Sequence, residues 1–225
     1  MGSLAFDAAS NGTPVNPGTS VTFSHTCTGT NLLLIVGVTV EGGNPPPDCI
    51  TGVTYNTVAM TKLNSTFNNV NNGDRTYLYG LVNPATGAHD VVVSSDTSLY
   101  IATSATSYSG ASQAGVPGTT AVANDDTAQA TFDVPITTPS DQCWVVGVVS
   151  DNGNGGPTAT SAYTARTDSG QRKIFDTNAD ITPAGSSTLS VSSAAGSIWT
   201  GVLAAIVPAT TTSANHNLGL LGVGT

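Results

Sequence analysis

The three cysteines are the residues of this chain best suited to redox or metal chemistry. Cys27, Cys49 and Cys143 are far apart in the sequence and form no CxxC pair and no dense disulfide framework. A Cys27–Cys49 disulfide stays open, but we expect three buried free thiols. Cys143 begins an apolar run, which favours a core residue over a nucleophile.

Carboxylates are the second source of chemistry. The segment DNGNGGP, residues 151–157, has the oxygen-rich, glycine-spaced composition of a calcium loop. It lacks the remaining EF-hand pattern and its bidentate glutamate, so we expect a polar turn, with calcium binding as the alternative. Asp125 and Asp126 are adjacent and are expected in a solvated loop. Glycoside hydrolysis needs two opposed carboxylates, and the sequence singles out no such pair beside its one glutamate, Glu41.

The three histidines predict no ligand set. His25 continues an alternating pattern with Phe23 and is expected to be a half-buried sheet residue. His89 and His216 lie in polar segments with no second ligand nearby. The sequence has no GxSxG, HExxH, P-loop or GxGxxG motif. We therefore predict no enzymatic activity, no catalytic residue, no cofactor and no metal site.

The elements that carry these residues are predicted to be almost entirely strands. Runs rich in Val, Ile, Thr, Tyr and Phe are bounded by Gly, Pro, Asn or Asp, and almost none has a helical apolar period. Three runs are apolar on both faces, which is typical of central strands: residues 31–40, 143–149 and 197–207.

Similar segments recur in the same order in the two halves of the chain. Gly37 aligns with Gly147, Tyr55 with Tyr163, and Pro84 with Pro183. We therefore predict an internal duplication. The expected fold is all-β: an antiparallel β-sandwich, jelly-roll or immunoglobulin-like, built from two halves that together form one sandwich. The predicted boundaries are 1–115 and 130–208 for the halves, 116–129 for a linker and 209–225 for an extended C-terminal arm.

Charge and hydropathy exclude several partners. The chain has 5 Lys and Arg against 14 Asp and Glu, a net charge of −9, so it offers little to a nucleic-acid backbone. The longest apolar runs are shorter than the roughly 20 residues that a membrane helix needs. The start, MGSLAFDAAS, lacks the basic and apolar regions of an export signal. We expect no nucleic acid and no membrane as partners.

Four segments carry a resemblance to a known group of proteins: FDAASN, FSHTCTGTNLLLIVGV, VTYNTVAMTKL and LYGLVNPATGAHDVVV. The chain resembles, over most of residues 4–208, a loosely defined group encoded by tailed bacteriophages. The resemblance implies a virion structural protein of β-sandwich type, such as a capsid decoration or cement protein that stabilises the head lattice. It implies as partners the major capsid protein and further copies of the chain, and location in the virion after assembly in the host cytoplasm.

Two surfaces are expected to meet partners. The arm carries Leu218, Leu220, Leu221 and Val223 between glycines, and we expect it to dock on another protein chain. The alternative function is a carbohydrate-binding module of a phage tail or head fibre that recognises host glycans. Its sugar site would need exposed aromatic rings, for which Tyr55, Tyr108 and Tyr163 are the candidates. The virion element and the oligomeric state stay open.

Overall fold

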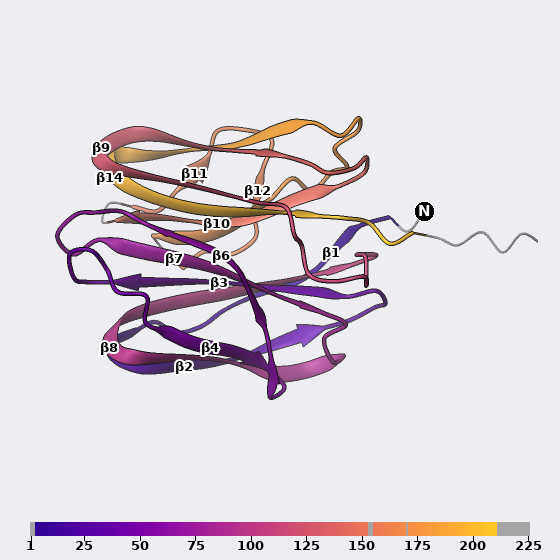
Figure 1. Ribbon diagram of the computed structural model, residues 1–225, viewed down its shortest axis with the longest axis horizontal. Coiled ribbons are helices and arrows are strands. Elements are labelled where there is room, and N and C mark those ends of the chain that lie inside the picture. The colour runs from indigo at the N-terminus through magenta and orange to yellow at the C-terminus, as the bar shows by residue number, and fades with distance from the viewer. Residues whose placement is uncertain (1–2, 153–154, 170, 211–225) are drawn as a thin grey trace, which may run out of the picture.

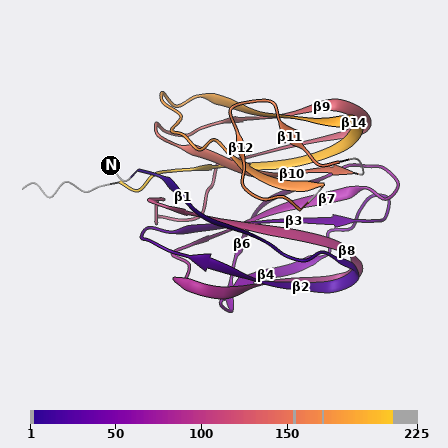
Figure 2. The ribbon, with the colours of Figure 1, turned by 180° about the vertical axis from the view of Figure 1, so that it is seen from behind.

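The computed structural model describes residues 3–152, 155–169 and 171–210. Over these residues the protein is all-β, as predicted, and its strands form two antiparallel sheets. The sheets lie one above the other in opposite views (Figures 1 and 2). The first contains β1 (Ala5–Asn11), β2 (Val15–Cys27), β3 (Leu33–Glu41), β4 (Ile50–Tyr55), β5 (Val58–Ala59), β6 (Thr61–Phe67), β7 (Asp74–Val82) and β8 (Gly87–Ser109). The second contains β9 (Thr120–Thr137), β10 (Trp144–Asn152), β11 (Thr158–Ala159), β12 (Thr164–Ala165), β13 (Arg172–Asp176) and β14 (Ser186–Ile206).

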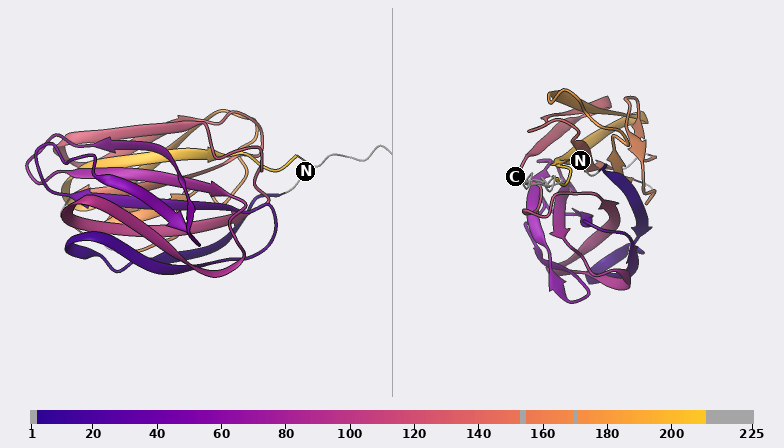
Figure 3. Two further views of the ribbon diagram at one scale, coloured as in Figure 1. Left: turned by 60° about the horizontal axis from the view of Figure 1, so that its bottom comes forward. Right: turned by 90° about the vertical axis from the view of Figure 1, so that its right-hand side faces the viewer.

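One long strand, β8, organises the first sheet. Its first part pairs with β2 and β4, and its last part pairs with β1 and β3. The sheet therefore curls on itself, and the end-on view shows it nearly closed (Figure 3). An apolar cluster that includes Val36, Tyr55 and Val91 fills the inside.

The strand β14 has the same place in the second sheet. Its first part pairs with β9 and β11, and its last part pairs with β9 and β10. The strands β10 and β13 extend this sheet as β3 and β7 extend the first. The single strand β9 runs along β14 as β1 and β2 together run along β8.

The aligned glycines lie on these corresponding strands but face opposite ways. Gly37, in the middle of β3, faces the second sheet, since a Cβ atom there would lie 2.9 Å from Cβ of Val148. Gly147, in the middle of β10, faces the inside of its own sheet, where a Cβ atom would lie 2.2 Å from a methyl carbon of Leu203. A match of Gly37 with Gly147 therefore exchanges the two faces of the strand, because side chains alternate between faces.

The two sheets pack face to face through a buried apolar layer. Leu33, Ile35 and Leu78 come from the first sheet, and Val146 and Val148 come from the second. Apart from Leu78 of β7, these residues belong to the runs that the sequence predicts to be buried on both faces. Burial between two sheets explains why the runs have no polar face.

The predicted linker of residues 116–129 is partly a strand. Thr120–Gln129 of the predicted linker belongs to β9, because its backbone pairs with the end of β14 even though most of its side chains are exposed. The three cysteines are free and buried, which confirms the predicted free thiols and not the alternative Cys27–Cys49 disulfide. Within the described residues, no helix is long and apolar enough to cross a membrane.

Candidate functional site

The chain turns sharply where β8 ends, and this turn meets the end of β14. Gly110 has a φ of +73°, a conformation that suits glycine. The Ser112 N–H donates to the Val207 carbonyl at 2.8 Å, and the Ala209 N–H donates to the Gly110 carbonyl at 2.7 Å. The last residues that follow β14 are therefore fixed to the turn after β8.

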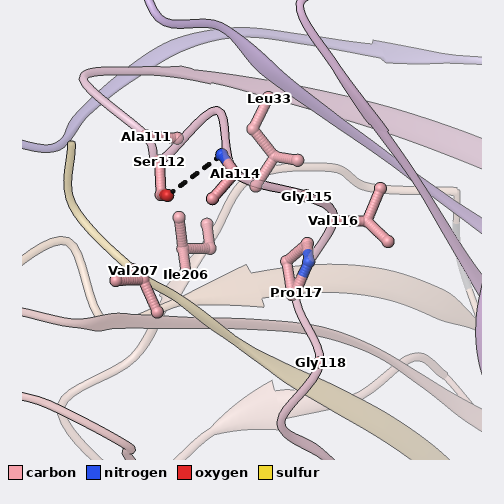
Figure 4. A pocket seen from close by; sticks show the side chains of 10 residues that line it. All are labelled: Leu33, Ala111, Ser112, Ala114, Gly115, Val116, Pro117, Gly118, Ile206 and Val207. Carbon is pink, nitrogen blue, oxygen red and sulfur yellow. Dashed lines mark hydrogen bonds between the residues drawn. The ribbon is translucent and has the colours of Figure 1, made fainter.

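A hollow of about 260 Å³ opens beside this junction; we call it the end hollow (Figure 4). Its apolar walls come from Leu33, Val116, Pro117, Ile206 and Val207. The Ser112 hydroxyl, also in the wall, accepts the N–H of Ala114 at 3.3 Å. The lining is mostly apolar and contains no acid, base or thiol, so its chemistry suits an apolar side chain.

A second hollow, of about 410 Å³, is also lined by Val207. Its walls include Pro208, Ala209 and Asp141, and the Asp141 carboxylate accepts the N–H of Ala184 at 2.6 Å. Both hollows therefore adjoin the segment that follows β14. The arm residues Leu218, Leu220, Leu221 and Val223 lie outside the described residues, as does His216.

His25 forms the centre of a polar network inside the first sheet. Its Nε2 lies 3.1 Å from the Ser107 hydroxyl, and its Nδ1 lies 2.8 Å from the Ser10 hydroxyl. Ser107 donates to the Asp7 carboxylate at 2.6 Å, so the Ser107 oxygen accepts from Nε2–H and Nδ1 accepts from Ser10. Asp7 therefore sets the tautomer of His25 through Ser107.

This network has a serine–histidine contact but a weak base. Desolvation lowers the pKa of His25 to about 4, although the charge of Asp7 opposes the shift. The imidazole is thus neutral at pH 7, and a base of such low pKa drives little proton transfer from a serine hydroxyl. His25 is buried, more deeply than the half-buried position that the sequence predicts.

The carboxylates singled out by the sequence are separated in the structure. Asp151 is buried, and burial raises its pKa despite the Ser193 hydroxyl and the Gly156 N–H. Asp125 accepts hydrogen bonds from Thr127, whereas Asp126 accepts the N–H of Asn69. Both aspartates lie in β9 and not in a loop. The described residues contain no group of three or more Asp, Glu, His or Cys side chains that could hold a metal ion.

The three tyrosines expected to stack on sugars are buried, so that expectation is wrong. Each hydroxyl has a partner within the protein: Tyr55 donates to the Gly87 carbonyl, Tyr108 donates to Asp176, and Tyr163 bonds Ser187. Among the described aromatic residues, Phe67 at the end of β6 has an exposed ring, with 36% of its surface accessible. The sequence shows Phe67 only as the last apolar residue before an asparagine-rich turn, which does not predict exposure.

The geometry defines an all-β protein of two curled, packed sheets with an apolar depression at one end. No family model, curated protein or solved structure matches this chain.

Proposed function

We propose that this chain is a bacteriophage virion structural protein, a capsid decoration or cement protein that stabilises the head lattice. The end hollow supports this proposal, because it gives the protein an apolar attachment point without catalytic groups. Val207, which follows β14 in the chain, lines this hollow, and the backbone of Ala209 is bonded to the turn beside it. The arm of residues 209–225 supplies the apolar side chains for a second attachment, to the major capsid protein or to another copy: Leu218, Leu220, Leu221 and Val223.

The packing of the two sheets suits a protein with a mechanical role. The Tyr108 hydroxyl of the first sheet donates to Asp176 of the second at 2.9 Å, and Thr76 bonds Thr200 across the same interface at 2.7 Å. These bonds and the apolar layer hold both sheets as one unit. A protein that binds only the assembled shell stabilises it by RT ln(1 + [L]/Kd) at every site, so many weak attachments add up.

We also propose that the protein is a β-sandwich and that its two sheets arose by duplication. The corresponding places of β8 and β14, and of β3 and β10, support a β-sandwich built from duplicated halves. The opposite directions of Gly37 and Gly147 then require a one-residue shift in the alignment of β3 with β10.

Composition of purified particles tests the decoration role. DNA-filled heads and separated tails of the phage that encodes the chain are analysed by quantitative mass spectrometry. We expect the protein on heads, in a fixed ratio to the major capsid protein that matches the lattice symmetry. Its presence on tails alone, or its absence from all particles, would overturn the proposal.

A further inference from the structure

Arg75 differs from every other basic residue of the chain in its surroundings. Lys62, Arg166, Arg172 and Lys173 each form an ion pair with a carboxylate. Among the residues that the structure describes, Arg75 has no such carboxylate partner. This is unexpected in a protein with 14 acidic and 5 basic residues. A guanidinium that stays unpaired in an acidic protein is free for an external anion.

The position of Arg75 is fixed on one side by the protein. Its guanidinium carbon lies 4.3 Å from the centre of the Phe67 ring, and its Nε donates to the Pro46 carbonyl at 3.0 Å. Stacking on a ring holds the guanidinium plane while its terminal N–H groups stay available along the edge. No residue in the described part of the chain accepts a hydrogen bond from these terminal nitrogens.

Phe67 and Arg75 line a hollow of about 430 Å³ between the end of β6 and β9; we call it the Phe67 hollow. The remaining walls are mostly polar and include Asn69, Asn124 and Asp126. The Asp126 Oδ1 atom accepts the Asn69 N–H at 2.8 Å, and Asn124 accepts from the Thr66 hydroxyl at 3.4 Å. The backbone of the asparagine-rich turn after β6 is thus connected to β9.

We propose that the Phe67 hollow binds a saccharide that carries a carboxylate, such as a uronic acid. The terminal N–H groups of Arg75 can donate two parallel hydrogen bonds to a carboxylate. The exposed Phe67 ring offers an apolar surface to the C–H face of a sugar ring. The second oxygen of Asp126 and the amides of Asn69 and Asn124 suit the sugar hydroxyls.

The combination of groups favours an acidic sugar over other anions. An inorganic anion would use Arg75 but neither the Phe67 ring nor the acceptor oxygen of Asp126. An acidic peptide offers the carboxylate, but it lacks the row of hydroxyl groups that could donate hydrogen bonds to the oxygens of Asp126 and the asparagines. This site lies on β6, β7 and β9 and is independent of the proposed attachment through the end hollow and the arm.

Titration of the full chain tests the site with defined probes. Methyl β-D-glucuronide, methyl β-D-glucoside, sodium acetate and a short aspartate-containing peptide are titrated and followed by calorimetry and NMR. We expect saturable glucuronide binding, with at least tenfold weaker binding of each of the other three probes. If the glucoside bound as tightly as the glucuronide, Arg75 would not recognise the carboxylate. If acetate or the peptide bound as tightly as the glucuronide, the site would not recognise the sugar ring. Either result, or the absence of glucuronide binding, would overturn the proposal.

Two variants and one control locate the binding. Phe67→Ala and Arg75→Gln should each weaken glucuronide binding at least tenfold. Val58→Ala removes another exposed apolar side chain, on β5 and outside the Phe67 hollow, and should leave binding unchanged. The Phe67 side chain is 36% exposed, and circular dichroism checks that Phe67→Ala is folded. Unchanged affinity in Phe67→Ala would overturn the site even if Arg75→Gln failed to fold.

Discussion

The Nη2 atom of Arg172 lies 3.3 Å from the Oδ1 atom of Asp74, and this contact joins the two sheets inside the protein. Arg172 starts β13 and Asp74 starts β7, so the pair closes one end of the interface. The same Nη2 lies 3.0 Å from Oε2 of Glu41, and Ser150 donates to the other oxygen of Asp74. Both members of the Arg172–Asp74 pair are almost fully buried.

Arg172→Met should destabilise the protein strongly, because it leaves the buried Asp74 carboxylate without its cation. Loss of one partner of a buried pair typically costs about 3–5 kcal/mol. Urea unfolding followed by tryptophan fluorescence measures the change. The double variant Arg172→Met with Asp74→Leu should recover part of the loss. Lys62→Ala, which breaks an exposed pair with Asp48, should change stability by less than about 1 kcal/mol.

His25 and Asp74 should make opposite contributions to the pH dependence of stability. His25 has a folded-state pKa of about 4, below its ordinary value of 6.5, so the unfolded state binds more protons between these pH values and stability falls as pH falls. Burial raises the pKa of Asp74 to about 6, although Arg172 and Ser150 oppose the shift. The folded state then binds more protons between pH 3.8 and 6, so this contribution rises as pH falls.

Variants at the two positions separate these slopes. Relative to wild type, His25→Gln should gain stability as pH falls from 6.5 to 4. The gain should be about 3 kcal/mol, because a pKa shift of one unit corresponds to 1.36 kcal/mol. Asp74→Asn should lose stability relative to wild type between pH 6 and 4. Guanidinium unfolding at pH 4, 5, 6 and 7 gives both differences. Parallel stability curves for wild type and His25→Gln would contradict a depressed pKa of His25.

The sequence predicts the strands better than the contacts between them. Residues 31–40 and 143–149 are apolar on both faces, and β3 and β10 are indeed central and buried. The sequence does not predict the first part of β9, because this part is an exposed edge in which Ala, Thr and Asp give no apolar alternation. The partners Arg172 and Asp74 are distant in sequence, and only the packing of the two sheets brings them together.

The candidate sites depend even more on tertiary structure. The end hollow forms because the turn after β8 meets the end of β14. Tyr55 has the alternating pattern of a strand residue, but nothing in the sequence indicates which face of β4 is covered. Phe67 lies at the end of β6, an edge strand, and this position depends on the sheet order, which a single run of residues does not reveal.

Cys143→Val should change the free energy of unfolding by less than about 1.5 kcal/mol, as substitutions that conserve core volume usually do. The Cys143 side chain is fully buried and free, and its sulfur lies 3.3 Å from the Ser140 hydroxyl. In the native protein its thiol should react with a disulfide reagent only after unfolding. A fast native reaction lost in Cys143→Val would contradict a purely structural role.

Gly37→Ala should destabilise the interface between the sheets. The new methyl group would lie 2.9 Å from Cβ of Val148, which forces one sheet to move, and overpacking of this kind costs about 1–3 kcal/mol. The methyl groups of Val148 also lie near the new atom, and Val148→Ala removes them. Val148→Ala should therefore relieve part of the cost of Gly37→Ala, which a double-mutant cycle measures as a favourable coupling energy. Gly52→Ala is the matched control, since a Cβ atom there meets nothing within 4 Å.

Removal of residues 211–225 should separate attachment from folding. The bonds from Ala209 to Gly110 and from Ser112 to Val207 stay intact in a chain that ends at Thr210. The truncated chain should therefore keep the melting temperature of the full chain. Burial of Leu218, Leu220 and Leu221 on a partner would contribute about 4–8 kcal/mol before the ordering entropy is subtracted. Occupancy of purified heads, measured by gel densitometry after incubation with either chain, should thus fall sharply without the arm. An unfolded truncated chain would show that the arm belongs to the core, and equal occupancy would show that it attaches to nothing.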